Sequence, residues 1–217
     1  CQWLRNKARV KPEIDPFTMP EADEIIADIY RHDGPLWGAW YELGFFTGLR
    51  YPSEPAALRW EDVDWREPSL RVRRSQTKWG IKESSKTGTH RVVKLNDRAL
   101  AALRRAQAVT GFADGFVFVQ DSGRPVGQAE PQRHMFRAAL RRLKMRPRPA
   151  YNMRHSYACA CLQARMKPGW VAAQLGHSLE EFFRSYARWI DSDDDARELA
   201  LMNAAFANVG KSLPRNL

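Results

Sequence analysis

The sequence predicts a mainly α-helical fold with a small antiparallel β-sheet inserted on one side, an α+β class. Apolar residues recur at helical spacing through most of the chain. Two stretches of strand-like composition flank a polar turn near the middle. The 217 residues are 44% hydrophobic and include eight tryptophans, which is enough to bury a core and argues against general disorder.

Helices are expected in sequence order along most of the chain. The first follows Thr18, which forms a predicted capping box with Glu21. A second, strongly apolar helix is predicted in "PLWGAWYELGFFTGL". Further helices are predicted in "NDRALAALRRAQAV" and near residues 128–145, 152–165, 168–175, 178–188 and 194–208.

The predicted sheet lies between the second and third helices. "SLRVRRSQTK" and "THRVVKLN" flank a polar turn, so they predict a β-hairpin. "GFVFVQ" (115–120) is a candidate for one more short strand. Residues 1–16 are extended and basic, and the first residue is Cys, so we expect a fragment of a longer protein with 1–16 as a linker from a missing N-terminal domain.

The charge of the chain favours a polyanionic partner. Its 35 Lys and Arg exceed its 25 Asp and Glu, a formal net charge of +10. Basic residues concentrate in 73–94 and in 133–148, and the second segment contains no acid. A solvated basic face is the simpler interpretation of either segment alone. Two such segments favour a nucleic-acid groove, with an anionic membrane surface as the second partner class.

Apolar runs, cysteines and possible metal ligands indicate the compartment of the protein and the cofactors it needs. No apolar run approaches the ~18 residues of a membrane span, and no signal peptide is recognisable. Cys159 and Cys161 lie in an apolar helical run and are predicted to be buried thiols in a reducing compartment. Neither metal-ligand spacing nor the carboxylate cluster of a two-metal nuclease is present, so no metal or other cofactor is expected.

Several separated polar residues are candidates for a site, although each alone has a structural interpretation. An arginine after a helix is usually a solvated cap, and a lysine at a hairpin tip is usually surface decoration. An arginine that opens an otherwise apolar helix is harder to explain structurally. The candidates, in order, are Arg50 after the second helix, Lys86 at the hairpin tip, Arg154 beside Tyr151 and His155, His177 between Gly176 and Ser178, and Tyr186.

Together these residues match the needs of a tyrosine that attacks a phosphodiester. Two permanently charged guanidinium groups can bind the non-bridging oxygens as charge develops on them. A phenol with a pKa near 10 needs help to lose its proton, which an imidazole or the field of the arginines can give. A lysine can protonate the departing 5′ oxygen, and no step requires a metal.

The chain resembles the catalytic domain of the tyrosine recombinases, or phage integrases, from about residue 15 to residue 190. The resemblance is carried by "TGLR…SE…ALRWEDVD", "SKTG…RVV", "RHSYA" and "LGHS" with a Tyr nine residues after its His. It implies that Arg50 and Arg154 clamp the scissile phosphate and that Glu54 braces the first arginine. It further implies Lys86 as the acid, His177 as a phosphate ligand and Tyr186 as the nucleophile that becomes joined to a DNA 3′ phosphate.

Two positions depart from the family pattern. Three residues instead of two separate Arg50 from Glu54, and Tyr151 occupies the position where the family usually has a histidine. A phenol can donate a hydrogen bond to a phosphate oxygen but is a poor proton acceptor. The first interpretation is that Tyr151 donates such a bond to a non-bridging oxygen. Two others stay open: His155 compensates for the missing histidine, or Tyr151 is itself a second nucleophile.

The resemblance implies a site-specific DNA recombinase of a mobile element in a prokaryotic cytoplasm, associated with the nucleoid. It implies double-stranded DNA as partner and four protomers on two duplexes. We expect a catalytic domain over 17–190 and a tail helix in 191–217 that contacts a neighbouring protomer, with packing on its own domain as the alternative. Two other functions remain open: a type IB topoisomerase-like DNA relaxing enzyme, and a catalytically silent DNA-binding protein of the same fold.

Overall fold

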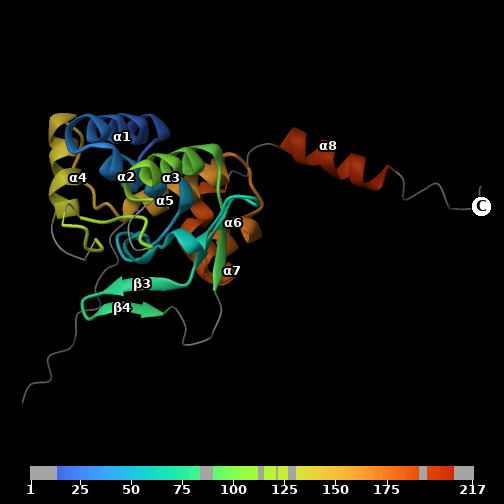
Figure 1. Ribbon diagram of the computed structural model, residues 1–217. Coiled ribbons are helices and arrows are strands. Elements are labelled where there is room, and N and C mark those ends of the chain that lie inside the picture. Colours follow the sequence, from blue (N-terminus) through green and yellow to red (C-terminus); the bar gives the residue numbers. More distant parts are fainter. Residues whose placement is uncertain are drawn as a thin grey trace, which may run out of the picture.

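The computed structural model describes residues 14–83, 90–111, 115–120, 122–126, 131–190 and 195–207. Within these ranges the fold is helix-rich with two small antiparallel sheets, as the sequence predicts (Figure 1). The helices are α1 (Met19–Asp33), α2 (Pro35–Thr47), α3 (Asp97–Thr110), α4 (Pro131–Arg142), α5 (Asn152–Gln163), α6 (Pro168–Leu175), α7 (Leu179–Tyr186) and α8 (Asp195–Phe206). Two short 3₁₀ turns, η1 (Pro55–Ala57) and η2 (Trp60–Asp62), follow α2, and a third, η3 (Ala187–Trp189), follows α7.

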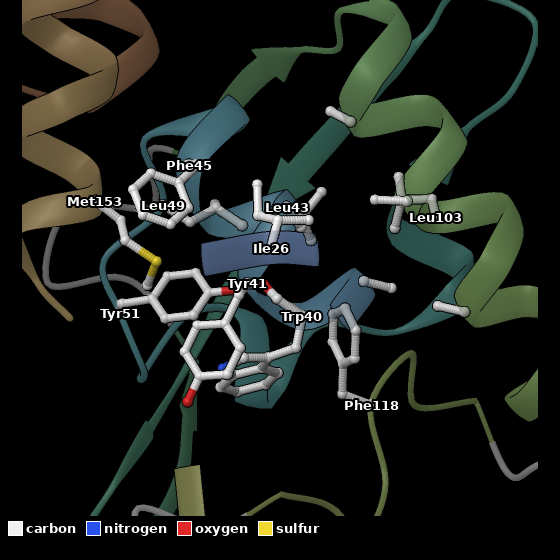
Figure 2. Packing of buried hydrophobic residues seen from close by; sticks show 14 of the residues in the cluster. Ile26, Trp40, Tyr41, Leu43, Phe45, Leu49, Tyr51, Leu103, Phe118 and Met153 are labelled. Carbon is white, nitrogen blue, oxygen red and sulfur yellow. Dashed lines mark hydrogen bonds between the residues drawn. The ribbon is translucent and has the colours of Figure 1, made fainter. Parts of the chain in front are cut away.

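Helix α2 is the centre of the larger hydrophobic core. Residues 38–45 of α2 are all buried, so the helix is covered on every side rather than along one stripe. Helices α1, α3 and α5 pack around it, and α4 packs on α1. Figure 2 shows the aromatic part of this core, where the Trp40 ring meets Tyr51 and Phe118 edge to face. Such edge-to-face contacts are favourable for aromatic quadrupoles.

A second, smaller core lies between α5, α6 and α7. Tyr157, Leu162, Leu175, Phe182 and Tyr186 are buried there, and both cysteines of α5 lie in the same cluster. Cys159 and Cys161 are free thiols, and burial raises the pKa of the first to about 12 and of the second to about 11. The sequence prediction of buried thiols is therefore confirmed.

The sheet region differs in detail from the single predicted hairpin. Strands β2 (Ser69–Val72) and β5 (Arg91–Lys94) do pair antiparallel, and β1 (Val63–Asp64) adds to β2. The connection between β2 and β5 forms a second hairpin, β3 (Arg74–Thr77) with β4 (Gly80–Glu83), which lies beside the helical body (Figure 1). Gly80 at φ 114° supplies the turn conformation that ends β3 and begins β4. Lys86 lies outside the described residues.

The prediction of a short strand over 115–120 is wrong. Only two isolated bridges form there, Arg59 with Phe116 and Val119 with Pro125. Pro125 has no backbone N–H and cannot extend a ladder, and Gly115 bends the chain with φ 77°. The apolar side chains of Val117 and Phe118 are buried in the core without a continuous strand.

The tail helix α8 is exposed along its whole described length. Every residue of 196–207 is exposed, and Figure 1 shows α8 standing apart from the helical body. Leu199, Met202 and Phe206 are each at least half exposed, and Val209 lies outside the described residues. In the described part of the chain, no helix is long and apolar enough to cross a membrane.

We predict that Phe182→Ala destabilises the domain by about 3–5 kcal/mol, because Phe182 is 0% exposed and its removal leaves a cavity beside Tyr186. Its neighbour Phe183 is 42% exposed and is the matched control. Phe183→Ala should change the stability by no more than about 0.5 kcal/mol. Urea denaturation of the two variants measures the difference, and equal stabilities would show that the second core contributes little.

Candidate active site

Arg154 is the buried centre of the site. It lies in the first turn of α5 and is 1% exposed. Its Nη1 donates to the Gly48 carbonyl at 2.5 Å, and its Nη2 donates to the Leu175 carbonyl at 2.7 Å. Burial, followed by the charge of Arg50, lowers the Arg154 pKa to about 10, so the side chain remains charged at neutral pH.

His177 lies directly against this guanidinium. Its Nε2 is 2.8 Å from Arg154 Nη2. The residue occupies the junction between α6 and α7, where Gly176 closes α6 at φ 69° and Ser178 caps α7 by accepting from the Glu181 backbone N–H. Burial and the charge of Arg154 lower the His177 pKa to about 4, so the imidazole is neutral.

Glu54 joins two further arginines to the site. Its buried carboxylate accepts from Arg50 Nη1 at 2.9 Å and from the Arg50 backbone N–H at 2.7 Å. Arg91 donates to both carboxylate oxygens in a fork. Burial alone would raise the Glu54 pKa, but the bonds and charge of Arg91, with the help of Arg50, lower it to about 2.

Arg50 and Arg91 also contact the α6–α7 junction. Arg50 Nη2 donates to the Gly176 carbonyl at 3.2 Å, and Arg91 Nε donates to the Gln174 carbonyl at 3.0 Å. The side chain of Arg50 remains 41% exposed. The end of α6 is therefore held by three guanidinium groups, one of which still faces solvent.

Tyr186, the last residue of α7, is buried in the smaller core, and its ring stacks on His177 with centroids 6.3 Å apart. Its Oη is 2.8 Å from His155 Nδ1, and the residue is 0% exposed. Burial raises the Tyr186 pKa and outweighs the charge of Arg154, which acts in the opposite direction. The phenol is therefore fully protonated in the structure at neutral pH.

Tyr151 lies at the N-cap of α5 and is 41% exposed. Its ring meets the His155 ring at 5.3 Å between centroids, edge to face. Burial and the charge of Arg154 lower the His155 pKa to about 4, so this imidazole is neutral as well. Tyr151 and Tyr186 thus both contact the His155 ring, and Tyr151 is the exposed one of the two.

The structure brings most of the predicted residues together. Arg50 is hydrogen-bonded to Glu54 and Arg154 to His177, while His155 on α5 contacts both Tyr151 and Tyr186. The two groups meet where the rings of His177 and Tyr186 stack, with centroids 6.3 Å apart. Arg91 is a further site residue that the sequence did not predict, although it begins the "RVV" part of the family resemblance. The alternation of buried and exposed residues in β5 does not predict that the side chain of Arg91, its first residue, reaches Glu54, 37 residues earlier.

A cavity adjoins this cluster without containing it. It has a volume of about 620 Å³ and lies between α2, α4 and the segment before α5, with Pro52 and Tyr151 at the edge nearest the site. Its walls combine core aromatics such as Trp40 and Phe136 with arginines of α4. Among the described residues, no group of three or more His, Cys, Asp or Glu is arranged to hold a metal ion.

Comparison with known proteins identifies the family. Residues 26–192 match the phage integrase family. The chain therefore belongs to the phage integrase family, the tyrosine recombinases. Prophage integrase IntR of Escherichia coli (strain K12) is 30% identical over 224 residues, which cover 90% of this chain and 52% of IntR. The chain thus spans about half the length of the curated relatives it matches.

Solved structures share the fold at lower identity. The Tn1549 transposon integrase in complex with transposon right end DNA has a TM-score of 0.71 and 20% identity, covering 90% of this chain and 67% of that one. The catalytic domain of bacteriophage HP1 integrase has a TM-score of 0.63 and 17% identity, covering 90% of this chain and 98% of that one. These similarities establish a tyrosine recombinase catalytic-domain fold.

We predict that Glu54→Gln removes a pH-dependent part of the stability. Because the Glu54 pKa falls from its ordinary 4.5 to about 2 on folding, the carboxylate stabilises the fold fully above about pH 4.5. This stabilisation, about 3 kcal/mol, is lost as the pH falls from 4.5 toward 2. The native chain should therefore exceed the Gln variant in stability at pH 7, and the gap should narrow at low pH.

Urea midpoints at a series of pH values measure this gap. Glu180→Gln is the control, because Glu180 is an exposed carboxylate paired only with Arg184 four residues on. A gap for Glu54→Gln that is the same at pH 7 and pH 2.5 would contradict the assignment.

Proposed function

We propose that this chain cuts and rejoins DNA strands as a site-specific recombinase of a mobile genetic element, with Tyr186 as the nucleophile. The observation that carries the proposal is a pair of unpartnered buried donors at the centre of the site. Arg154 Nε is buried and lacks a hydrogen-bond partner within the described structure, and the same is true of His177 Nδ1. Buried donors without partners are costly, so both favour an oxygen-rich ligand.

The charge around these donors selects an anion. Arg50, Arg91 and Arg154 bring three positive charges close together, while Glu54 is the carboxylate that binds two of them. A phosphodiester bound between Arg50 and Arg154 would supply acceptor oxygens and negative charge at once. Guanidinium groups suit this task because they stay charged and present planar pairs of donors.

The arginines of the basic segment 133–148 fall into two groups, one that stabilises the fold and one that lies on the surface. In 133–148, Arg142 pairs with Asp28 and Arg148 with Glu21, and both pairs tie α4 and its following loop to α1. Arg133, Arg137 and Arg141 instead are exposed, recur every four residues and line one wall of the cavity beside Tyr151. This stripe offers a positively charged surface for DNA next to the proposed phosphate site.

Relatives support the same substrate class. The Tn1549 integrase structures of this fold contain transposon right end DNA or circular intermediate DNA. By the family resemblance, Lys86 would protonate the leaving 5′ oxygen, and residues 1–16 would continue from a separate DNA-binding part. Double-stranded DNA is accordingly the proposed substrate. In the relatives, the half of the chain that this sequence does not match would supply further DNA contacts.

The burial of Tyr186 is also compatible with an alternative function, a DNA-binding protein that does not cleave, and this alternative can be tested. A nucleophile at 0% exposure suits a resting site, and it also suits a DNA-binding protein that never cleaves. A covalent adduct separates the two possibilities. A relaxing enzyme of the topoisomerase type would form the same adduct but act as a monomer, so the assembly experiment below separates it from a recombinase.

We predict that Tyr186→Phe abolishes strand cleavage while DNA affinity stays nearly unchanged, because affinity comes mainly from phosphate contacts. The substrate is a nicked duplex from the DNA that flanks the coding gene, in which the released 5′ fragment diffuses away. The native chain should form a denaturant-resistant adduct on the tryptic peptide "SYAR". Tyr151→Phe is the control and should slow cleavage only about tenfold to a hundredfold. An adduct on "YNMR" would make Tyr151 the nucleophile.

We propose further that α8 docks on a neighbouring protomer, since Leu199, Met202 and Phe206 form an exposed apolar stripe. Removing residues 192–217 should reduce the size of complexes on DNA, measured by native electrophoresis, without lowering the thermal unfolding midpoint. Phe206→Asp should weaken assembly in the same direction, whereas Ala204→Asp adds the same charge on the opposite, exposed face of α8 and should not. Complexes of unchanged size after truncation would refute the docking.

A further inference from the structure

The two histidines of the site face opposite kinds of partner. His177 Nε2 lies 2.8 Å from an Arg154 nitrogen, whereas His155 Nδ1 lies 2.8 Å from the Tyr186 hydroxyl. A guanidinium donates hydrogen bonds but keeps its protons, whereas a phenol that donates a hydrogen bond can also give up its proton. The partners therefore fix what each imidazole is able to do.

His177 is committed to donating. Because Arg154 donates to Nε2, the lone pair of that nitrogen is occupied, and in the neutral ring the proton sits on Nδ1. Nδ1 is the buried donor without a partner. His177 can therefore offer a hydrogen bond to a phosphate oxygen, but it has no lone pair free to take a proton from Tyr186.

His155 is in the opposite position. Its Nδ1 faces Oη of Tyr186, and a neutral imidazole with the proton on Nε2 accepts the phenolic hydrogen bond. Residue 151, where the family usually has a histidine, is a tyrosine here, and its ring packs edge-on against His155. Tyr151 thus covers the imidazole without being able to replace it as a proton acceptor.

We propose that His155 is the general base of this site and takes the proton of Tyr186 through Nδ1. The inference rests on the proposed strand-cleavage function. As the bond between Tyr186 Oη and phosphorus forms, the phenolic proton passes to His155 Nδ1 and the bond from phosphorus to the 5′ oxygen breaks. The leaving oxygen takes its proton from the acid, Lys86 in the proposed function. Rejoining reverses each transfer, so the imidazolium returns its proton to Tyr186.

The bound phosphate would strengthen this base. In the free protein, burial and the charge of Arg154 on the same helix oppose a positive imidazolium and lower the His155 pKa, and the rings of Tyr151 and Tyr186 contact the imidazole. A phosphodiester held by Arg50 and Arg154 brings a negative charge that offsets Arg154. His155 therefore becomes a better proton acceptor when DNA occupies the site.

The test compares His155→Asn with the native chain on the nicked flanking-DNA duplex, as single-turnover adduct formation across a pH series. Asn keeps a polar atom near the position of Nδ1 but cannot take a proton. We expect adduct still on "SYAR", formed about 10²–10⁴-fold more slowly at pH 7, the usual contribution of a general base. The native rate should level off above the pKa of the bound imidazole, whereas the variant rate should keep rising with pH.

Two controls separate chemistry from structure. His32→Asn, on α1 and away from the site, should leave rate and pH profile unchanged. In His155→Ala, added imidazole should restore part of the rate of adduct formation. This rescue tests the base role even if the Asn variant folds poorly. A slower Asn variant with the native pH profile, or no rescue by imidazole, would refute the base role. Absence of any adduct from the native chain would instead refute the cleavage function itself.

Discussion

The buried guanidinium of Arg154 is the constraint on which the rest of the site depends. A desolvated charge is tolerated best where its donors have partners, and here two carbonyls accept from Nη1 and Nη2, which leaves only Nε without a partner within the described structure. Gly48 closes α2 and Leu175 ends α6, so both carbonyls lie at helix C-termini, where the helix dipole favours a cation. Arg154 thereby links the large core around α2 to the small core of α6 and α7. A Cβ at Gly48 would meet the Tyr157 ring at 2.6 Å, so this approach requires glycine.

Glu54 sets how much positive charge the site can hold before a ligand arrives. It neutralises part of the charge of Arg50 and Arg91 and fixes both side chains against the end of α6. The extra residue between Arg50 and Glu54, compared with the family pattern, leaves this contact intact, because Glu54 reaches both the backbone and the side chain of Arg50. The result is a preorganised, electron-poor site, and preorganised charge is worth most where water is excluded.

The sequence predicted the helices well because each carries its own period and caps. Thr18 and Glu21 form the expected capping box, and Ser178 caps α7. The sheet was predicted less well, since composition cannot distinguish one long hairpin from the pair β2–β5 with β3–β4 between them. Within the site, resemblance selected the residues, but the Glu54–Arg91 fork and the His155–Tyr186 contact join positions 37 and 31 residues apart and appear only after folding. Charge counting also overstated the free basic surface, since several arginines hold helices together.

The closed position of Tyr186 connects the proposed chemistry to the proposed assembly. The Tyr186 ring packs against Phe182 and Trp189, and its hydroxyl contacts His155. Under the proposed chemistry, strand cleavage therefore requires α7 and η3 to shift or the bound DNA to open their packing. Tyr186 lies nine residues before Asp195, the first residue of α8. A docked α8 would therefore restrain the segment that holds Tyr186, the proposed nucleophile, through a short connection, and an undocked one would not. Under the proposed docking, each protomer adjusts the nucleophile of its own site according to whether a neighbour has bound its tail, which couples cleavage to assembly on DNA without any change in the phosphate clamp.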